Sequence, residues 1–140
     1  MKFVIDSNVF VGGLDPKDIF HGECQHIIDR LLYLDIEALC PTIVLVETVC
    51  VIRRRTNDKR VATAVLQNLI KIPSLTWLEL SVDAAASACK MGVETGLRGG
   101  DSIVLYIAHQ YGIPLITKDK EMKAKAPYGV TIVDPSDVRL

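Results

Sequence analysis

The chain has 140 residues, of which 49% are hydrophobic and 24% are charged, and its formal net charge is −1. This length and composition indicate one folded domain over residues 1–140 and exclude a disordered chain. The balanced charge excludes a uniformly basic coat for nucleic acid but is compatible with a local basic patch.

Short apolar runs alternate along the chain with longer segments whose apolar residues recur at helical spacing. The short runs predict strands, and the longer segments predict helices. In the first half we expect, in order, a strand at 3–5, a helix at 19–34, a strand at 36–40 and helices at 43–55 and 58–70. In the second half we expect a strand at 75–80, two helices that start at 81 and 101, a strand at 113–117, a short lysine-rich helix and a strand at 130–133.

Polar and glycine residues mark the ends of several predicted helices. Thr42 and Ser81 have side chains that can cap a first helical turn, and Asp101 opens another helix. Gly112 suits the left-handed residue that commonly follows a helix. Five short strands that alternate with helices indicate an α/β sandwich around a parallel sheet.

Neither membrane insertion nor disulfide bonding is expected. The most apolar stretch is interrupted by Glu47, and no apolar run approaches the ~18 residues that a membrane span needs. Asp6 interrupts the segment that would serve as a signal peptide. The cysteines stand among apolar neighbours, so we expect buried, reduced thiols in a cytoplasmic protein. These cysteines are Cys24, Cys40, Cys50 and Cys89.

Four acidic residues are expected to meet at one edge of the sheet. In βα units the carboxyl ends of the strands and the amino ends of the helices share an edge, where ligands bind. Asp6 follows the first predicted strand, and Asp119 lies two residues after Thr117, at the end of the fourth. Asp101 opens a helix, and Glu47 lies in the second turn of the helix after the second strand.

Each of these acids also has an ordinary structural interpretation. Asp6 and Asp101 could cap helices, and Asp119 could be a solvated turn residue. Glu47 could reach sideways to solvent, but helical spacing surrounds it with apolar residues, where a carboxylate needs a cation, hydrogen bonds or a raised pKa.

A cation would explain the gathering of several carboxylates at one edge, because without one they repel each other. Their hard oxygen atoms suit Mg²⁺ or Mn²⁺. Such a cluster is typical of enzymes that hydrolyse phosphodiester bonds with a metal-activated water.

At these residues the sequence resembles the PIN-domain family of metal-dependent ribonucleases, especially the small single-domain VapC-type toxins. The segments that carry the resemblance, in order over nearly the whole chain, are DSNVF at 6–10, VLVE at 44–47, LRGGDSI at 97–103 and LITKD at 115–119. The resemblance implies a three-layer α/β/α sandwich whose five-stranded parallel sheet has the order 3-2-1-4-5. It implies that the catalytic, metal-binding residues for Mg²⁺ or Mn²⁺ are Asp6, Glu47, Asp101 and Asp119. It also implies an endoribonuclease that acts on RNA, forms a homodimer and, as a toxin, binds an antitoxin protein.

Basic and polar residues near the acids are candidates for holding RNA, since carboxylates alone repel phosphates. A lysine segment at 118–125 adjoins the fourth motif, and another basic run lies at 53–60, where it could meet RNA, a partner or only solvent. The predicted substrate-binding residues are Asn8, Arg98, Thr117, Lys118 and Lys120. Aromatic residues make up only 6% of the chain and none is interleaved with these basic runs, so base stacking is not expected to dominate binding.

Several other interpretations remain open. A haloacid-dehalogenase-like phosphatase would use Asp6 as nucleophile but needs a second aspartate where Asn8 stands. A receiver domain needs a phosphoacceptor aspartate after the third strand, but Ser81 follows that strand. A zinc site at His21 and Cys24 lacks a second pair of ligands. A non-toxin RNA-processing nuclease and a catalytically weak module that binds RNA or a protein also remain.

Overall fold

The computed structural model describes residues 1–139, and within them five parallel strands form one sheet in the order β3-β2-β1-β4-β5. The order confirms both the parallel sheet and the strand arrangement that the family resemblance implies. The strands are β1 (Lys2–Ile5), β2 (Glu37–Pro41), β3 (Leu75–Leu78), β4 (Leu115–Ile116) and β5 (Ile132–Val133).

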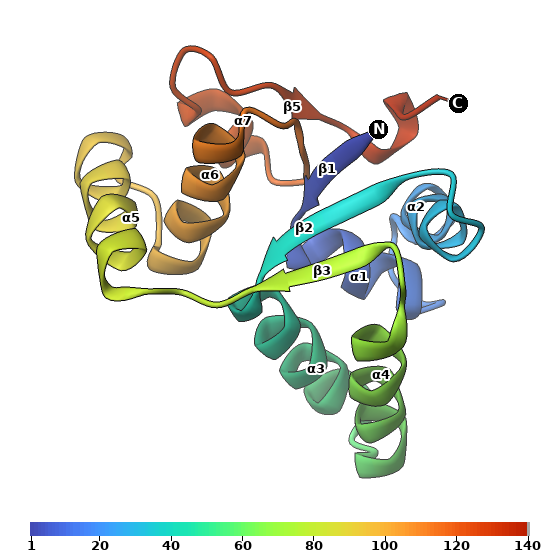
Figure 1. Ribbon diagram of the computed structural model, residues 1–140. Coiled ribbons are helices and arrows are strands. Elements are labelled where there is room, and N and C mark those ends of the chain that lie inside the picture. The colour runs from blue at the N-terminus through green and yellow to red at the C-terminus, as the bar shows by residue number, and fades with distance from the viewer. Residues whose placement is uncertain (140) are drawn as a thin grey trace.

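Helices cover both sides of this sheet, which confirms the three-layer α/β/α sandwich (Figure 1). On one side, α5 (Val82–Thr95) packs against α6 (Gly99–Tyr111). On the other side, α1 (Ser7–Leu14) contacts both α2 (His21–Leu32) and α3 (Thr42–Thr56). The remaining helical elements are α4 (Lys59–Lys71), which pairs with α3, the short α7 (Lys120–Lys125) and a 3-10 turn, η1 (Pro135–Asp137).

The two central strands are buried on both faces, which is why they appear in the sequence as continuous apolar runs. Val4 and Ile5 of β1 and both residues of β4 are fully buried. Ile5 pairs with Ile116 in the parallel register. The polar residues that follow these two strands therefore emerge side by side at one edge of the sheet.

Helix α1 was not predicted, because its residues have weak helix propensity. The segment contains β-branched residues and two glycines. It is nevertheless helical, since Asp6 caps its first turn and the glycines let α2 approach closely. A Cβ atom on Gly13 would lie 2.5 Å from Ile28 Cδ1 and 2.9 Å from the Cys24 carbonyl oxygen.

Two expected helix starts are wrong by one or two residues. Pro41, not Thr42, is the N-cap of α3, and it has no side-chain capping bond. Helix α6 begins at Gly99, so Asp101 lies within its first turn instead of opening it. The structure confirms Ser81, whose Oγ accepts a hydrogen bond from Ala84 N at 3.1 Å.

The three strands in the second half of the chain are shorter than expected. Regular pairing stops at Leu78 in β3, and β4 and β5 have two residues each. The helix predicted at 19–34 is α2, which is shorter at both ends. Gly112 ends α6 in the left-handed conformation with φ 62°, as predicted.

The prediction of four buried cysteines is wrong for two of them. Cys24 and Cys40 are buried, but Cys50 and Cys89 are exposed because they lie on the outer faces of α3 and α5. All four thiols are free, as expected. Among the described helices, none combines the length and apolar character needed to cross a membrane.

Candidate active site

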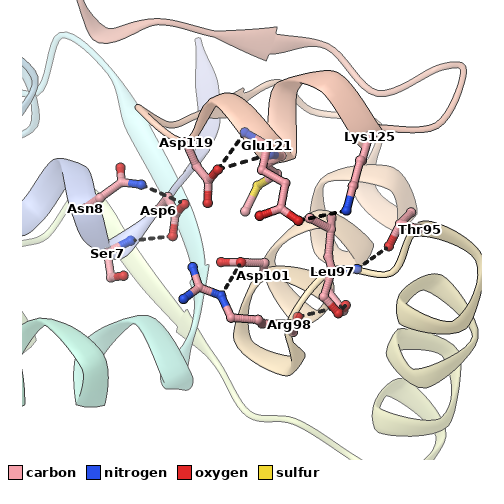
Figure 2. Close-up of polar contacts among 12 residues, drawn as sticks. Asp6, Ser7, Asn8, Thr95, Leu97, Arg98, Asp101, Asp119, Glu121 and Lys125 are labelled. Carbon is pink, nitrogen blue, oxygen red and sulfur yellow. Dashed lines mark hydrogen bonds and ion pairs between the residues drawn. The ribbon is translucent and has the colours of Figure 1, made fainter.

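Asp6 lies at the end of β1, and its residue surface is only 3% exposed. Its Oδ1 accepts a hydrogen bond from Ser7 N at 2.8 Å (Figure 2). Its Oδ2 accepts from Thr117 Oγ1 at 2.8 Å and from Asn8 Nδ2 at 3.2 Å. The pKa of Asp6 is raised to about 6, chiefly by burial, with smaller contributions from Asp101 and Glu47, while the hydrogen bonds from Thr117 and Ser7 oppose the shift.

Asn8 and Thr117 form a polar bridge between the ends of the two central strands. Asn8 Nδ2 also donates to Thr117 Oγ1 at 3.1 Å, and its Oδ1 accepts from Lys118 N at 3.1 Å. Thr117 Oγ1 accepts a further bond from Asp119 N at 3.0 Å. Both side chains thus hydrogen-bond the Asp6 carboxylate, and a direct role for them in binding substrate stays a prediction.

Glu47 projects from α3 toward the first turn of α6. A Cβ atom built on Gly100 would lie 2.9 Å from Glu47 Oε2, so the carboxylate occupies the space that this glycine leaves. Burial raises the pKa of Glu47, and Asp101 raises it further, against the Ser7 hydroxyl and Arg98, which lower it. Glu47 is thus half-buried at the acidic edge, as predicted.

Asp101 and Asp119 face the same region from α6 and from the start of α7 (Figure 2). Burial raises the pKa of Asp101, with Arg98 lowering it and Asp119 raising it. Arg98 Nε lies 3.4 Å from Asp101 Oδ2, although the arginine side chain is 83% exposed. Asp119 caps α7, since its Oδ1 accepts from Glu121 N at 2.9 Å and from Met122 N at 3.1 Å.

The acids match the donor chemistry of a hard divalent cation. Within residues 1–139, no three His, Cys, Asp or Glu side chains stand close enough to ligate one ion as they are arranged. The set fits such an ion chemically, because burial and mutual repulsion raise the pKa of Asp6, Glu47 and Asp101. The zinc alternative gains no support, since Cys24 is buried and burial raises the pKa of its thiol to about 12, which disfavours the thiolate that zinc binds.

The predicted lysines differ in their surroundings. Lys118 Nζ lies 2.8 Å from both Glu23 and Asp134, so its charge is already paired. A phosphate would have to compete with these two carboxylates for Lys118, whose role in holding RNA stays a prediction. Lys120 is exposed beside Asp119 and keeps that candidate role.

The sequence motifs did not predict two features of the site. Gly100 provides the space for the Glu47 carboxylate, and only the glycine pair before Asp101 hinted at a close approach. Ser7 donates its backbone N–H to the adjacent Asp6, and its hydroxyl also lowers the pKa of Glu47. The contacts of Glu47 with Gly100 and with Ser7 join segments that are distant in the sequence.

Comparison with known proteins agrees with this geometry. The PIN domain family model matches residues 3–127 of the chain. No curated protein sequence matches the chain at a significant level.

Three solved structures that share the fold show how similar the chain is to known proteins. VapC20 of Mycobacterium tuberculosis, described as a sarcin-ricin loop cleaving toxin, is 18% identical, with a TM-score of 0.75 over 94% of this chain and 99% of that one. The DNA-bound VapBC of Salmonella typhimurium is 20% identical, with a TM-score of 0.71 over 96% and 98%. FitAcB of Neisseria gonorrhoeae is 16% identical, with a TM-score of 0.70 over 99% and 100%.

Proposed function

The chain belongs to the PIN-domain family, and from that premise we propose that it is a metal-dependent endoribonuclease, the toxin of a toxin–antitoxin pair. It would hydrolyse RNA phosphodiester bonds with a metal-activated water, using Mg²⁺ or Mn²⁺. The fold shared with toxins of known structure supports this proposal. The whole chain would act as one catalytic domain.

The observation that carries the proposal is the buried carboxylate of Asp6. Within the described chain it has hydrogen-bond donors but no ion-pair partner, and two further acids raise its pKa. A buried carboxylate that lacks a cation costs folding free energy. A site that binds a divalent cation and then a phosphodiester accounts for that cost.

The residues of the chain would divide the work as follows. Asp6, Glu47, Asp101 and Asp119 would hold the ion, while Asn8 and Thr117 keep the Asp6 carboxylate oriented. When bound, the ion supplies a water of lowered pKa and stabilises charge on the phosphate oxygens. The exposed residues Arg98 and Lys120 would position the RNA backbone beside the acids.

A toxin of this kind would act in the cytoplasm as a homodimer and bind an antitoxin protein. Solved structures with this fold that are described as toxin–antitoxin complexes or systems support the choice of partner. Growth arrest on expression of the chain alone, relieved by Asp101→Asn, is the expected result. A chain that cleaves RNA but is tolerated would favour the RNA-processing alternative.

The decisive experiment is RNA cleavage by the purified protein in Mg²⁺, Mn²⁺ or EDTA, with circular RNA included to detect internal cuts. We expect metal-dependent cleavage, lowered by more than about 100-fold in Asp101→Asn, because even outer-shell changes at metal sites cost 10–100-fold. Asp83→Asn is the control, since Asp83 occupies the first turn of α5 as Asp101 does in α6. Cleavage that resists EDTA would refute the proposal, and RNA binding without cleavage would favour the weak binding module.

A further inference from the structure

A pocket of about 460 Å³ opens directly beside the acidic edge. Its walls come from α1, the loop before α2, the helix α3 and the segment after β4. The residues that matter for its chemistry are Val11, Ile19, Phe20, Val51, Arg55 and Lys118.

The pocket is continuous with the proposed catalytic site. Ser7, Asn8 and Asp119 line it as well as the acidic edge. A group that fills the pocket is therefore adjacent to whatever lies over Asp6 and Asp119. For an RNA whose phosphate is at the acids, that adjacent group is part of the same or the next nucleotide.

Apolar side chains give the pocket its binding surface. Phe20 is 36% exposed and Ile19 is 88% exposed, although both are large and apolar. Val11 and Val51 contribute aliphatic surface from two helices. Aromatic and aliphatic walls of this kind suit a flat uncharged group, since bases stack on aromatic side chains without regard to sequence.

The charged residues in the pocket wall do not favour the binding of a phosphate. Each of the two cations is already paired with two carboxylates, so negative charge is in local excess. The Arg55 pairs join the loop before α2 to α3, and the Lys118 pairs join the segment after β4 to α2 and to the segment after β5. The pairs, at 2.8 or 2.9 Å, are Arg55 with Asp15 and Asp18, and Lys118 with Glu23 and Asp134.

We propose that this pocket receives the base of a nucleotide next to the scissile phosphate. The inference rests on the ribonuclease function proposed above and adds a base-binding subsite to it. Lys118 Nζ lies over the Phe20 ring, 4.2 Å from its centroid, so the base would pack against the part of Phe20 that stays exposed and against Ile19. Its phosphate would lie outside the pocket at the acids. Phe20 lies outside both basic runs, so a search for aromatic residues among basic ones does not find it.

The test couples a change in the protein to a change in the RNA. Oligoribonucleotides that lack one base at a time are cleaved by the wild type, Phe20→Ala and Ile19→Ala. In the wild type, removal of the base at one position beside the cut should lower kcat/KM by about 5- to 150-fold, the range for one base–aromatic stack. The effect should fall mainly on KM, because the base packs equally well in the ground and transition states. In Phe20→Ala and Ile19→Ala, intact RNA should show a similar rise in KM, and removal of that base should cost little more.

Val82→Ala is the matched control, since Val82 is 86% exposed but lies at the start of α5, away from the pocket. It should behave as the wild type. Ile19→Ala keeps the test valid if Phe20→Ala does not fold, because the exposed Ile19 side chain adds little to the packing of the fold. If both pocket variants cleave RNA as the wild type does and depend on the same base to the same extent, the inference is overturned but the proposed function is not. A wild type that does not cleave RNA would overturn the proposed function as well.

Discussion

The carboxylate of Asp6 carries an energetic penalty that its neighbours only partly relieve. It is almost completely buried, and its hydrogen bonds come from a backbone N–H, a hydroxyl and an amide, none of which is charged. Hydrogen bonds stabilise a buried carboxylate but do not replace a cation. The net effect of burial and these hydrogen bonds is a pKa of about 6, well above the ordinary 3.8.

The pKa of Asp6 predicts that the metal-free protein loses stability as pH rises. The native state binds this proton more tightly than the unfolded chain, in which the aspartate titrates near 3.8. The contribution of Asp6 is therefore fully present below about pH 4 and is lost as pH passes 6, by about 3 kcal/mol in total. Asp6→Asn should flatten the decline in the free energy of unfolding between pH 4 and pH 7. Urea melts in EDTA measure it, and an equally steep decline in the variant would contradict the assignment.

Glu47 offers a second test of whether the charges of the acidic edge destabilise the metal-free protein, at a half-exposed position. Glu47→Gln keeps the shape of the side chain and removes a charge that Asp101 repels. The metal-free variant should be as stable as the wild type or more stable, by at most on the order of 1 kcal/mol because solvent screens the repulsion. Metal affinity and RNA cleavage should both fall. A destabilised but fully active variant would mean that Glu47 is structural and lies outside the catalytic set.

At the scale of elements, the first turn of α6 leaves room for the Glu47 carboxylate from α3. Gly100→Ala should displace that carboxylate, since the new Cβ would lie 2.9 Å from Oε2. The free energy of unfolding should be unchanged or rise by about 0.5–1 kcal/mol, because alanine favours the helix and the end of a glutamate can move. RNA cleavage and metal affinity should fall despite the intact fold.

Gly99→Ala provides the matched control in the same helical turn. A Cβ on Gly99 meets nothing within 4 Å, so this variant should retain cleavage. Urea melts and cleavage rates of the two variants separate the effects on stability and on the site. Equal activity in both would show that the position of Glu47 does not matter for the reaction.

The elements that could be predicted from the sequence are those whose pattern is local. Continuous apolar runs identified the central strands, and Ser81 identified the start of α5. Helix α1 could not be predicted, because its formation depends on close packing of Gly13 against α2. The topology brought the four acids to one edge, as expected from the order of strands and helices.

The partners of individual side chains were much harder to predict than the edge at which they lie. The sequence placed Lys118 beside an acid and therefore suggested RNA binding. In the fold its ammonium reaches Glu23 and Asp134, and it also lies 4.2 Å from the centroid of the Phe20 ring. These contacts join segments far apart in the chain, so no local pattern reveals them. The same is true of the pocket next to the acids.

At the scale of the whole molecule, a net charge of −1 means that RNA binding must depend on a local arrangement of cations. Several cations near the acids are occupied: Lys118 is paired, and Lys125 Nζ lies 2.8 Å from Glu121 Oε1. Arg98 also contacts Asp101 at 3.4 Å, but its side chain is 83% exposed, and together with the exposed Lys120 it lies at the rim of the acidic edge. The affinity for RNA should therefore depend on few ionic interactions with phosphates.

The combined change Arg98→Ala and Lys120→Ala should weaken RNA binding and reduce its salt dependence. Removal of one cation that neutralises a phosphate of a single strand lowers the log–log salt slope by about 0.7, so the pair should lower it by about 1.4. The comparison is Lys59→Ala with Arg60→Ala, two exposed residues at the start of α4 in the other basic run. Binding titrations over a range of salt concentrations, with Asp101→Asn as the background to prevent cleavage, measure both slopes. A larger fall for the α4 pair would move the RNA path to the basic run at 53–60, because salt-dependent affinity follows the cations that neutralise phosphate.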